Sequence, residues 1–492
     1  LYRQIMAEYA GIVGLQQAWE DMDEAAKCEW LVQTLDEPVE IATVPLSDQA
    51  EETAALFSVG GRAYHRYGDR AIGGHVISMT RAASDVLSVL WMARHLTDYD
   101  PPLPIVPLFE TIDDLRRSGE TLDTLLSNPT YREHVKRLGD TQTVMIGYSD
   151  STKDGGYVAA CWGLYEAQSA LHEVAEKHGV KLVFFHGRGG SLGRGGGPAA
   201  RGIESLPEGT VDGAIRMTEQ GEVLAERYDD PDIAHRHLEQ VVSATILRWT
   251  RAATAPKQNW LTTMRQLAKD AFAKYRALVE REGFVEYFRA ATPIDEIERL
   301  QIGSRPSRRR SGATLDDLRA IPWVFAWTQS RHMLPAWYGL GAAAEPLIEN
   351  KRSLQTLRAM YNRWPFFQAM IDNATLALVK FDPDIARRYS ELAGATDQTS
   401  HPWSDIEAEW NRTKSVVTTI CEVDHLLEDV GWLRRSIEGR NPYIDPVNLL
   451  QIRLLRELRS LGDDAESHRL DELRELVRLS IQGVAAGMRT TG

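Results

Sequence analysis

The segment KLVFFHGRGGSLGRGGGP, residues 181–198, joins a short apolar run to a loop made largely of glycine. Its first five residues have the length and apolar content of a buried β-strand. The seven glycines within residues 185–198 let the backbone adopt positive φ angles and come close to a ligand. Arg188 and Arg194 stand in this loop, and arginine suits bidentate recognition of phosphate or carboxylate. The segment therefore predicts an anion-binding site at the end of a strand.

Two common glycine-rich loops do not match this segment. A dinucleotide-binding fingerprint needs a third glycine where Leu192 stands, five residues after Gly187. A P-loop that began at Gly190 would need lysine where the chain has Gly196. A flexible linker or a nucleic-acid-binding Arg/Gly segment would also be rich in glycine. A linker rarely follows a buried strand directly, and the Arg/Gly segment occurs here without repeats, so we favour the anion site.

The composition is that of an acidic globular protein. At 492 residues the chain is long enough for two or more domains, or for one large α/β unit with additions. Its net charge of -14 argues against a general nucleic-acid binder, which would have to neutralise phosphates. The three cysteines show no pairing or metal-binding spacing, which is typical of a reducing compartment. With neither a signal peptide nor an apolar run of membrane-spanning length, we expect a cytoplasmic protein without membrane or nucleic-acid partners.

The beginning of the chain and its helical patterns bear on how it is organised. The first residues are typical of a helix without an initiator methionine or an N-cap, so we expect a piece cut from a longer chain. Over the first 350 residues, short apolar runs alternate with helical patterns, which predicts a parallel sheet, open or closed. The expected strands are residues 75–80, 105–109, 143–148, 182–185 and 214–218, with helices such as 84–96 and 157–178 between them.

From about Asp230 onward the sequence predicts helices almost throughout. The Asp-Pro pairs at residues 230–231, 382–383 and 445–446 predict three helix starts, because aspartate caps a helix and proline fits its first turn. The apolar stripes Val447, Leu450, Leu454 and Leu458, and Leu470, Leu473 and Val477, predict packing in the core or against another subunit. We also expect the aromatic cluster Trp323, Phe325, Trp327, Trp337 and Tyr338 to be core.

Polar side chains follow three of the expected strands: Glu110, then Asp150, then Arg188. In a barrel of this type the active residues follow the carboxyl ends of the strands. Carboxylate oxygens suit hard cations such as Mg²⁺, so Glu110 and Asp150 are candidate metal ligands. The alternative is that Asp150 and Asp154 cap the following helix, and the two roles are compatible. These residues indicate an α/β enzyme that binds a small substrate carrying phosphate and carboxylate.

A basic loop at residues 303–312 carries several further arginines. A solvated surface is the plain interpretation, and a nucleic-acid or nuclear-targeting role is weak in an acidic protein. We interpret these arginines as directed at the same anion as the glycine loop.

Taken together, these motifs resemble those of the phosphoenolpyruvate carboxylases. Residues 144–156 are similar to the lysine signature of that family, and residues 184–198 to its glycine-loop signature. Further matches follow in the family's order at residues 109–111, 218–222, 303–305, 319–339 and 485–488. The resemblance runs from end to end of the chain and covers the C-terminal part of the family, slightly over half of a complete subunit.

The resemblance implies a fold and an activity. The fold would be mostly α with a parallel (β/α)₈ TIM-barrel-like core that lacks its N-terminal strands. The activity would be that of a lyase of anaplerotic carbon fixation, which converts phosphoenolpyruvate and bicarbonate to oxaloacetate and phosphate. Residues 1–345 would hold the barrel part with the active-site loops, and residues 346–492 a helical C-terminal region with an effector site. The complete protein would be a homotetramer.

The resemblance also assigns roles to individual residues. Glu110 and Asp150 would bind Mg²⁺ or Mn²⁺. The catalytic residues would be Lys153, His186 and Arg194, and the substrate-binding residues Arg188, Arg305 and Arg319. Arg194 would orient bicarbonate and the carboxyphosphate intermediate, while Arg188 and Arg319 would hold the substrate phosphate.

Two departures from the family pattern change these expectations. The family's catalytic histidine and a further phosphate-binding arginine belong to the N-terminal half, so we expect the chain alone to lack full activity. The alternative function is a catalytically incomplete fragment that retains metal, substrate or effector binding and serves assembly or regulation.

The second departure concerns inhibition by aspartate or malate. The family's effector site resembles Lys380, Arg440 and Arg194, but its last member is an asparagine where this chain has Thr490. Threonine offers one hydroxyl, whereas asparagine offers both an NH₂ donor and a carbonyl acceptor. We therefore expect weakened inhibition.

Overall fold

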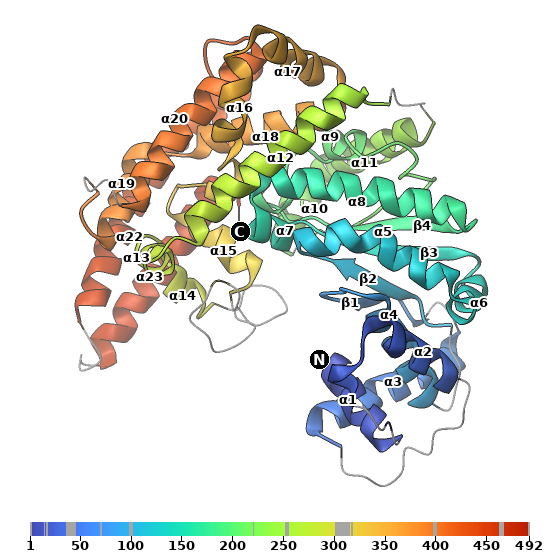
Figure 1. Ribbon diagram of the computed structural model, residues 1–492. Helices are drawn as coiled ribbons and strands as arrows, with labels where there is room; N and C mark the ends of the chain where they lie inside the picture. The colour runs from blue at the N-terminus through green and yellow to red at the C-terminus, as the bar shows by residue number, and fades with distance from the viewer. Residues whose placement is uncertain are drawn as a thin grey trace. The chain divides into compact units, whose positions relative to one another are not determined.

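The computed structural model describes residues 2–13, 15, 18–35, 46–68, 71–97, 102–219, 221–250, 255–300, 315, 318–396, 401–461 and 467–490. The chain divides into two compact units (Figure 1). The first consists of Leu1–Gly147, Glu166–His186 and Gly209–Arg216, and the second of Tyr148–Tyr165, Gly187–Glu208 and Met217–Gly492. Among the described residues, no helix has both the length and the apolar content that crossing a membrane requires.

The described residues contain a five-stranded parallel sheet whose strands follow the order of the chain. The strands are β1 (His75–Ile77), β2 (Ile105–Phe109), β3 (Thr141–Gly147), β4 (Lys181–Gly187) and β5 (Arg216–Met217). His75 pairs with Ile105, and Leu108 with Met145, both in parallel register. All five strands expected from the sequence are confirmed, with small shifts at their ends. Closure of such a sheet into a (β/α)₈ barrel stays a prediction.

Helices pack on the sheet of the first unit. All five residues of β2 are buried, as expected for a parallel strand covered on both faces. Helices α4 and α5 contact β2, and α6 contacts β3 (Figure 1). The helices of this unit are α1 (Tyr2–Ile12), α2 (Glu24–Thr34), α3 (Asp48–Tyr67), α4 (Ala83–His95), α5 (Ile112–Ser127) and α6 (Pro129–Arg137), with the short 3₁₀ turn η1 (Trp19–Asp21). Helix α8 (Tyr157–Lys177) contributes residues to both units.

The second unit is largely helical, as the sequence predicts. Its helices are α7 (Ser149–Gly155), α9 (Ala199–Glu204), α10 (Gly221–Tyr228), α11 (Pro231–Thr250), α12 (Gln258–Val279), α13 (Phe284–Ala290), α14 (Ile294–Ile297), α15 (Ala320–Gln329), α16 (Leu340–Ile348), α17 (Lys351–Arg363), α18 (Pro365–Lys380), α19 (Pro383–Ser390), α20 (Pro402–Cys421), α21 (Gly431–Glu438), α22 (Asn441–Ser460) and α23 (Ser467–Met488). Short 3₁₀ turns are η3 (Leu192–Arg194), η5 (Leu334–Ala336), η6 (Glu391–Ala393) and η7 (Glu428–Val430).

One hydrophobic core holds these helices together. The side chains of Trp323, Trp327 and Trp337 are fully buried in it, and Phe325 and Tyr338 are nearly so. The prediction that this aromatic cluster is core is therefore confirmed. Helices α12, α16 and α20 pack side by side in the same unit (Figure 1).

The apolar stripes of the last two helices are confirmed in part. Leu454, Leu473 and Val477 are buried where α22 packs against α23. Leu450, by contrast, is 52% exposed, so the predicted stripe on α22 is only partly covered within this chain. Contact with another subunit stays a prediction.

Two of the three Asp-Pro pairs mark helix starts as predicted. Helix α11 begins at Pro231 and α19 at Pro383, and the preceding aspartates accept backbone N–H groups of the first turn. The third prediction is wrong, because Pro446 lies inside α22, which already begins at Asn441. An Asn-Pro pair stands at the observed start of the helix, and it gives the same kind of helix-start signal one turn before the Asp-Pro pair. The aspartate before Pro446 instead pairs with a buried arginine.

That arginine is Arg331, whose side chain is 1% exposed. Its Nη1 donates to Oδ1 of Asp445 at 2.8 Å, and its Nη2 lies 3.7 Å from Oδ2 of Asp382. It also donates to the Asn441 side chain at 3.2 Å and to the Lys380 carbonyl at 3.3 Å. A buried guanidinium is costly unless its hydrogen-bonding capacity is met. Arg331 therefore links the end of α18 to the starts of α19 and α22.

We predict that Arg331→Leu strongly destabilises the protein, because two aspartates lose their buried counter-charge. Removing one partner of a buried ion pair costs about 3–5 kcal/mol. The matched control is Arg478→Leu, which breaks the exposed pair with Glu475 and is expected to cost less than about 1 kcal/mol. Urea unfolding followed by circular dichroism measures both, and equal midpoint shifts would contradict the role of Arg331.

Candidate active site

Glu110 stands directly after β2 and is 6% exposed. Its Oε2 accepts the backbone N–H of Met79 at 2.7 Å. Met79 has a φ of 56°, a left-handed value that is uncommon for a residue with a side chain. Gly147, the last residue of β3, leaves room for the carboxylate, since a Cβ there would lie 3.1 Å from the Glu110 Cγ. Neighbouring strand ends thus hold Glu110 in place.

Asp150 and Lys153 lie on α7, the short helix after β3. Asp150 is in its first turn, where a negative charge is favourable beside the helix N-terminus. The N-cap itself is Tyr148, which makes no side-chain cap hydrogen bond, so the capping role considered for Asp150 is wrong. The carbonyl of Lys153 accepts the Tyr275 hydroxyl at 2.7 Å, which fixes α7 against α12.

Arg194 lies in the glycine loop and is 1% exposed. Its Nε donates to Oγ of Ser149 at 3.0 Å, and its carbonyl accepts the N–H of Gly189 at 2.7 Å. The first bond ties the loop to the residue before Asp150, and the second closes the loop on itself. The structure therefore brings Arg194 to the start of α7. Its partner there, Ser149, directly precedes the candidate metal ligand Asp150 in the sequence.

Arg188 is held by the same loop. Its Nε donates to the carbonyl of Gly195 at 2.7 Å. Gly195 has a φ of 77°, and a Cβ there would lie 2.3 Å from the Tyr148 ring. Burial lowers the pKa of Arg188 and raises the pKa of Tyr148 to about 12, so the tyrosine is neutral at neutral pH. The loop backbone and a neutral ring thus hold the guanidinium.

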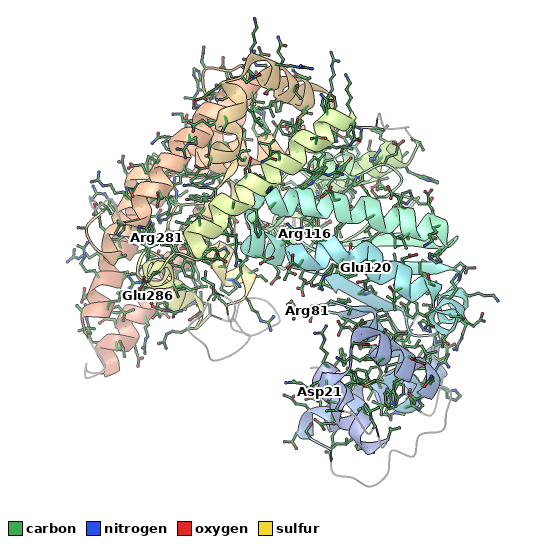
Figure 2. All side chains as sticks on the ribbon, in the orientation of Figure 1. Asp21, Arg81, Arg116, Glu120, Arg281 and Glu286 are labelled. Atoms are coloured by element: carbon green, nitrogen blue, oxygen red, sulfur yellow. The ribbon has the colours of Figure 1, made fainter. Side chains whose placement is uncertain are left out.

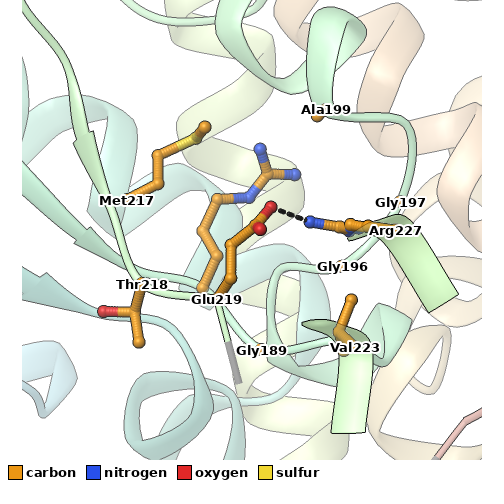
Figure 3. A pocket seen from close by; sticks show the side chains of 11 residues that line it. Gly189, Gly196, Gly197, Ala199, Met217, Thr218, Glu219, Val223 and Arg227 are labelled. Atoms are coloured by element: carbon orange, nitrogen blue, oxygen red, sulfur yellow. Dashed lines mark hydrogen bonds and ion pairs between the residues drawn. The ribbon is translucent and has the colours of Figure 1, made fainter. Parts of the chain in front are cut away.

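A small cavity beside the glycine loop is lined by an ion pair. Its acidic member belongs to a motif matched from the sequence, but the sequence assigned that residue no role. Glu219, from the motif at residues 218–222, pairs with Arg227 across the cavity (Figure 3). His237 Nε2 lies 3.0 Å from the same carboxylate. Burial favours a raised pKa of Glu219, but hydrogen bonds from Tyr228 and Arg227 outweigh it and lower the pKa. The volume of about 20 Å³ suits a single water molecule rather than a substrate.

The other predicted site residues are placed as follows. His186 is 1% exposed near the end of β4, with its ring 6.2 Å from that of Phe184. Arg319 is half-buried at the N-cap position of α15. Arg305 and the basic loop lie outside the described residues. The described residues thus bring Arg188, Arg194 and Ser149 together through the glycine loop.

The residues of the expected effector site meet at the C-terminal end of α23. Lys380 Nζ donates to the carbonyl of Met488 at 3.4 Å, and Arg440 Nη1 donates to that of Gly487 at 3.0 Å. Cations are favourable at this end of a helix. Thr490 follows directly and is 9% exposed. The structure therefore brings Lys380, Arg440 and Thr490 to one place.

Glu110 and Asp150 are the two carboxylates that the sequence predicts as metal ligands. Within the described ranges, no group of three or more His, Cys, Asp or Glu side chains forms a metal-binding cluster. Magnesium sites usually combine one or two carboxylates with substrate oxygens and water. Glu110 and Asp150 fit such a site in the kind of donor that they supply.

A second cavity, of about 430 Å³, lies in the first unit. Arg81 and Glu120, both labelled in Figure 2, are on its wall. Arg3 crosses it to Asp85, with 2.6 Å between Nε and Oδ1. Because carboxylates balance most of its cations, this cavity adds little to the anion-binding chemistry of the glycine loop.

The fold and the loop define an α/β protein that presents one buried and one half-buried arginine, Arg194 and Arg188, after the carboxyl end of a parallel strand. The family model of phosphoenolpyruvate carboxylase matches residues 1–492, and the chain belongs to that family. It is 41% identical to the phosphoenolpyruvate carboxylase of Roseiflexus castenholzii, over 99% of this chain and 53% of the relative. It is 42% identical to that of Rhodopseudomonas palustris (96% and 51%) and 43% identical to that of Gloeobacter violaceus (96% and 52%). The chain thus spans about half the length of the curated relatives it matches.

We predict that Gly195→Ala loosens the glycine loop, because the new Cβ would collide with the Tyr148 ring. The matched control is Gly179→Ala, where φ is also positive, at 62°, but no atom lies within 4 Å of the new Cβ. The control should lose only the free energy needed to hold an alanine in the left-handed backbone conformation, about 1–2 kcal/mol. Hydrogen exchange over residues 188–197 should accelerate for Gly195→Ala alone. Equal exchange in both variants would show that the ring contact does not order the loop.

Proposed function

We propose that this chain is the C-terminal catalytic region of a phosphoenolpyruvate carboxylase, a lyase that forms oxaloacetate and phosphate from phosphoenolpyruvate and bicarbonate. The observation that carries the proposal is the buried guanidinium of Arg194, bonded to Ser149 at the start of α7. A cation fixed in this way before substrate arrives can stabilise negative charge that develops during a reaction. The membership of the whole chain in the family supports the same reaction.

Each site residue has a role in this proposal. Glu110 and Asp150 would hold Mg²⁺ or Mn²⁺, which, when bound, would offset negative charge on the substrate oxygens. Arg188 and Arg319 would bind the substrate phosphate, together with Arg305. Arg194 would orient bicarbonate and the carboxyphosphate formed from it.

The remaining groups would line the reacting pocket and keep water out. Lys153 and His186 would stand beside the reacting atoms, His186 from the end of β4 and Lys153 from α7. The glycine loop would exclude water, since an enolate exposed to water is protonated to pyruvate rather than carboxylated.

The proposal extends to the architecture of the longer protein. The five strands would belong to a (β/α)₈ barrel, with residues 1–345 carrying the active-site loops and residues 346–492 the effector region. We further propose a homotetramer in the cytoplasm, inhibited by aspartate or malate through Lys380, Arg440, Arg194 and Thr490. The contacts of Lys380 and Arg440 at the end of α23 support a common site for these cations.

The alternative function is a catalytically incomplete fragment that binds metal, substrate or effector and serves assembly or regulation. Its support is that the chain spans about half the length of its relatives. The family's catalytic histidine belongs to the other half. The two functions differ in turnover and not in ligand binding.

We predict that bicarbonate-dependent oxaloacetate formation, with Mn²⁺ present, requires a second chain. The assay compares the 492-residue chain alone with the chain mixed with the N-terminal half of the Roseiflexus castenholzii relative. Activity only in the mixture would support the carboxylase proposal and the need for the missing histidine. Manganese and substrate binding without activity in either case would support the fragment. Activity of the chain alone would show that another base, such as His186, replaces that histidine.

The matched control for this assay is Arg194→Ala in the mixture. Loss of a preplaced donor to developing charge typically costs about 100- to 1000-fold in turnover. Phosphoenolpyruvate binding should fall by much less, because Arg188 and Arg319 remain. Equal losses in turnover and binding would contradict the role given to Arg194.

We predict that Thr490→Asn strengthens inhibition by aspartate in the active mixture. The asparagine would restore an NH₂ donor and a carbonyl acceptor where threonine has one hydroxyl. One gained hydrogen bond to a charged ligand corresponds to roughly a tenfold lower inhibition constant. The conservative variant Thr490→Ser should leave the constant unchanged. Identical inhibition constants for threonine and asparagine would overturn the expectation.

A further inference from the structure

The ion pair beside the glycine loop joins three elements through one carboxylate. Glu219 stands two residues after β5, and its Oε1 accepts a hydrogen bond from Arg227 on α10. Nε2 of His237 on α11 lies 3.0 Å from the same oxygen, and the Tyr228 hydroxyl donates to the same carboxylate. The carboxylate is therefore held in one place, and it determines where Arg227 lies.

Arg227 shares the small cavity with Arg188. Of the described residues that line this cavity, three are charged: Arg188, Arg227 and Glu219. Burial is the main cause of the lowered pKa of Arg188, and the positive charge of Arg227 contributes to it. Two like charges in a partly desolvated place repel each other strongly. Glu219 therefore supplies the negative charge that offsets the second arginine.

The two arginines differ in their freedom to move. The guanidinium of Arg188 lies against α9, since a Cβ at Gly202 would lie 2.2 Å from its Nη1. Its Nε is also bound by the carbonyl of Gly195. The side chain of Arg227 is 27% exposed and also lines a larger cavity, of about 680 Å³, in the same unit. Arg227 is thus the cation that would change position if its carboxylate partner lost its charge.

Helix α10 also touches the glycine loop itself. A Cβ at Gly190 would lie 2.5 Å from Cγ2 of Val223. Val223 and Arg227 are four residues apart and so share one face of α10, and both line the small cavity (Figure 3). The face of α10 that carries Arg227 therefore lies beside the loop that carries Arg188 and Arg194.

We propose that Glu219 is a positioning residue, which keeps Arg227 away from the anion that Arg188 binds. The inference rests on the proposed role of Arg188 as a ligand of the substrate phosphate. With Arg227 neutralised, the phosphate would have one position, on Arg188 and beside Arg194 of the same loop. An unpaired Arg227 would offer the phosphate a second position, in which part of the substrate is held away from the reacting groups.

The test removes the charge and keeps the shape. Glu219→Gln retains the side-chain length and an acceptor oxygen but removes the negative charge. The double variant Glu219→Gln/Arg227→Gln leaves neither charge without its partner. The control is Asp123→Asn, because Asp123 likewise bonds to a cation and a histidine, Lys177 and His178, and does not line the small cavity.

The first measurement is the affinity of each variant for phosphoenolpyruvate with Mn²⁺, by isothermal titration calorimetry on the 492-residue chain. Glu219→Gln should bind about tenfold more tightly, because an unpaired cation attracts the substrate. The double variant and Asp123→Asn should lie within about twofold of the unaltered protein. Unchanged or weaker binding by Glu219→Gln would overturn the inference. A double variant that binds much more weakly would also overturn it, since Arg227 would then be a ligand of the substrate.

The second measurement is turnover in the mixture with the N-terminal half of the Roseiflexus castenholzii relative. Glu219→Gln should lower kcat about tenfold while KM also falls, the combination expected when substrate is held in an unreactive position. The double variant should recover kcat, because the competing cation is gone. A loss of kcat that the second substitution does not restore would assign Glu219 a purely structural role and overturn the inference.

The outcomes separate this inference from the proposed function. Binding of phosphoenolpyruvate by the unaltered chain, with the same affinity in Glu219→Gln, overturns the inference alone. The expected affinities without turnover in the mixture overturn the carboxylase proposal and leave the inference standing. If the unaltered chain does not bind phosphoenolpyruvate, the role of Arg188 and this inference fail together. Thermal unfolding verifies that each variant is folded, and if Glu219→Gln does not fold, the affinity of the double variant decides.

Discussion

The contact between the backbone of Gly195 and the ring of Tyr148 is the constraint on which the candidate site depends. The ring occupies the space that any side chain at residue 195 would need. Because Tyr148 is the N-cap of α7, the contact places the glycine loop beside the start of that helix. Arg188 bonds to the carbonyl of Gly195, so its guanidinium is positioned through the same contact. The buried Arg194 and the half-buried Arg188 thus take their positions from the start of one short helix.

The elements that the sequence predicted well depend on local signals. The five strands follow from short apolar runs, and the starts of α11 and α19 follow from an aspartate that bonds within its own turn. The failure at Asp445 has a different origin, because its partner Arg331 lies 114 residues earlier in the chain. The ion pair between Asp445 and the buried Arg331 depends on tertiary packing, which no local sequence pattern encodes.

In the candidate site, too, some features could be predicted from the sequence and others depend on tertiary packing. The residue types, arginines among glycines and carboxylates after strands, could be predicted, and the family resemblance assigned them roles. The hydrogen bonds that fix them could not, since the Arg194–Ser149 bond joins residues 45 apart and the Glu219–His237 pair residues 18 apart. The hydroxyls of Ser191 and Thr490, which have no hydrogen-bond partner among the described residues, were equally hidden, because serine and threonine are common and their burial depends on distant segments.

The hydrogen bonds at the end of α23 have a thermodynamic consequence. Lys380 and Arg440 donate to the carbonyls of Met488 and Gly487. In the proposed effector site, a bound carboxylate and the last turn of the helix would be rival acceptors for the same cations. Every 1.4 kcal/mol of free energy in the bonds between these cations and that turn would lower the affinity for an anionic ligand about tenfold. Fraying of the turn would restore that affinity. The stability of one helix end would thereby set the ligand concentration at which the proposed site responds.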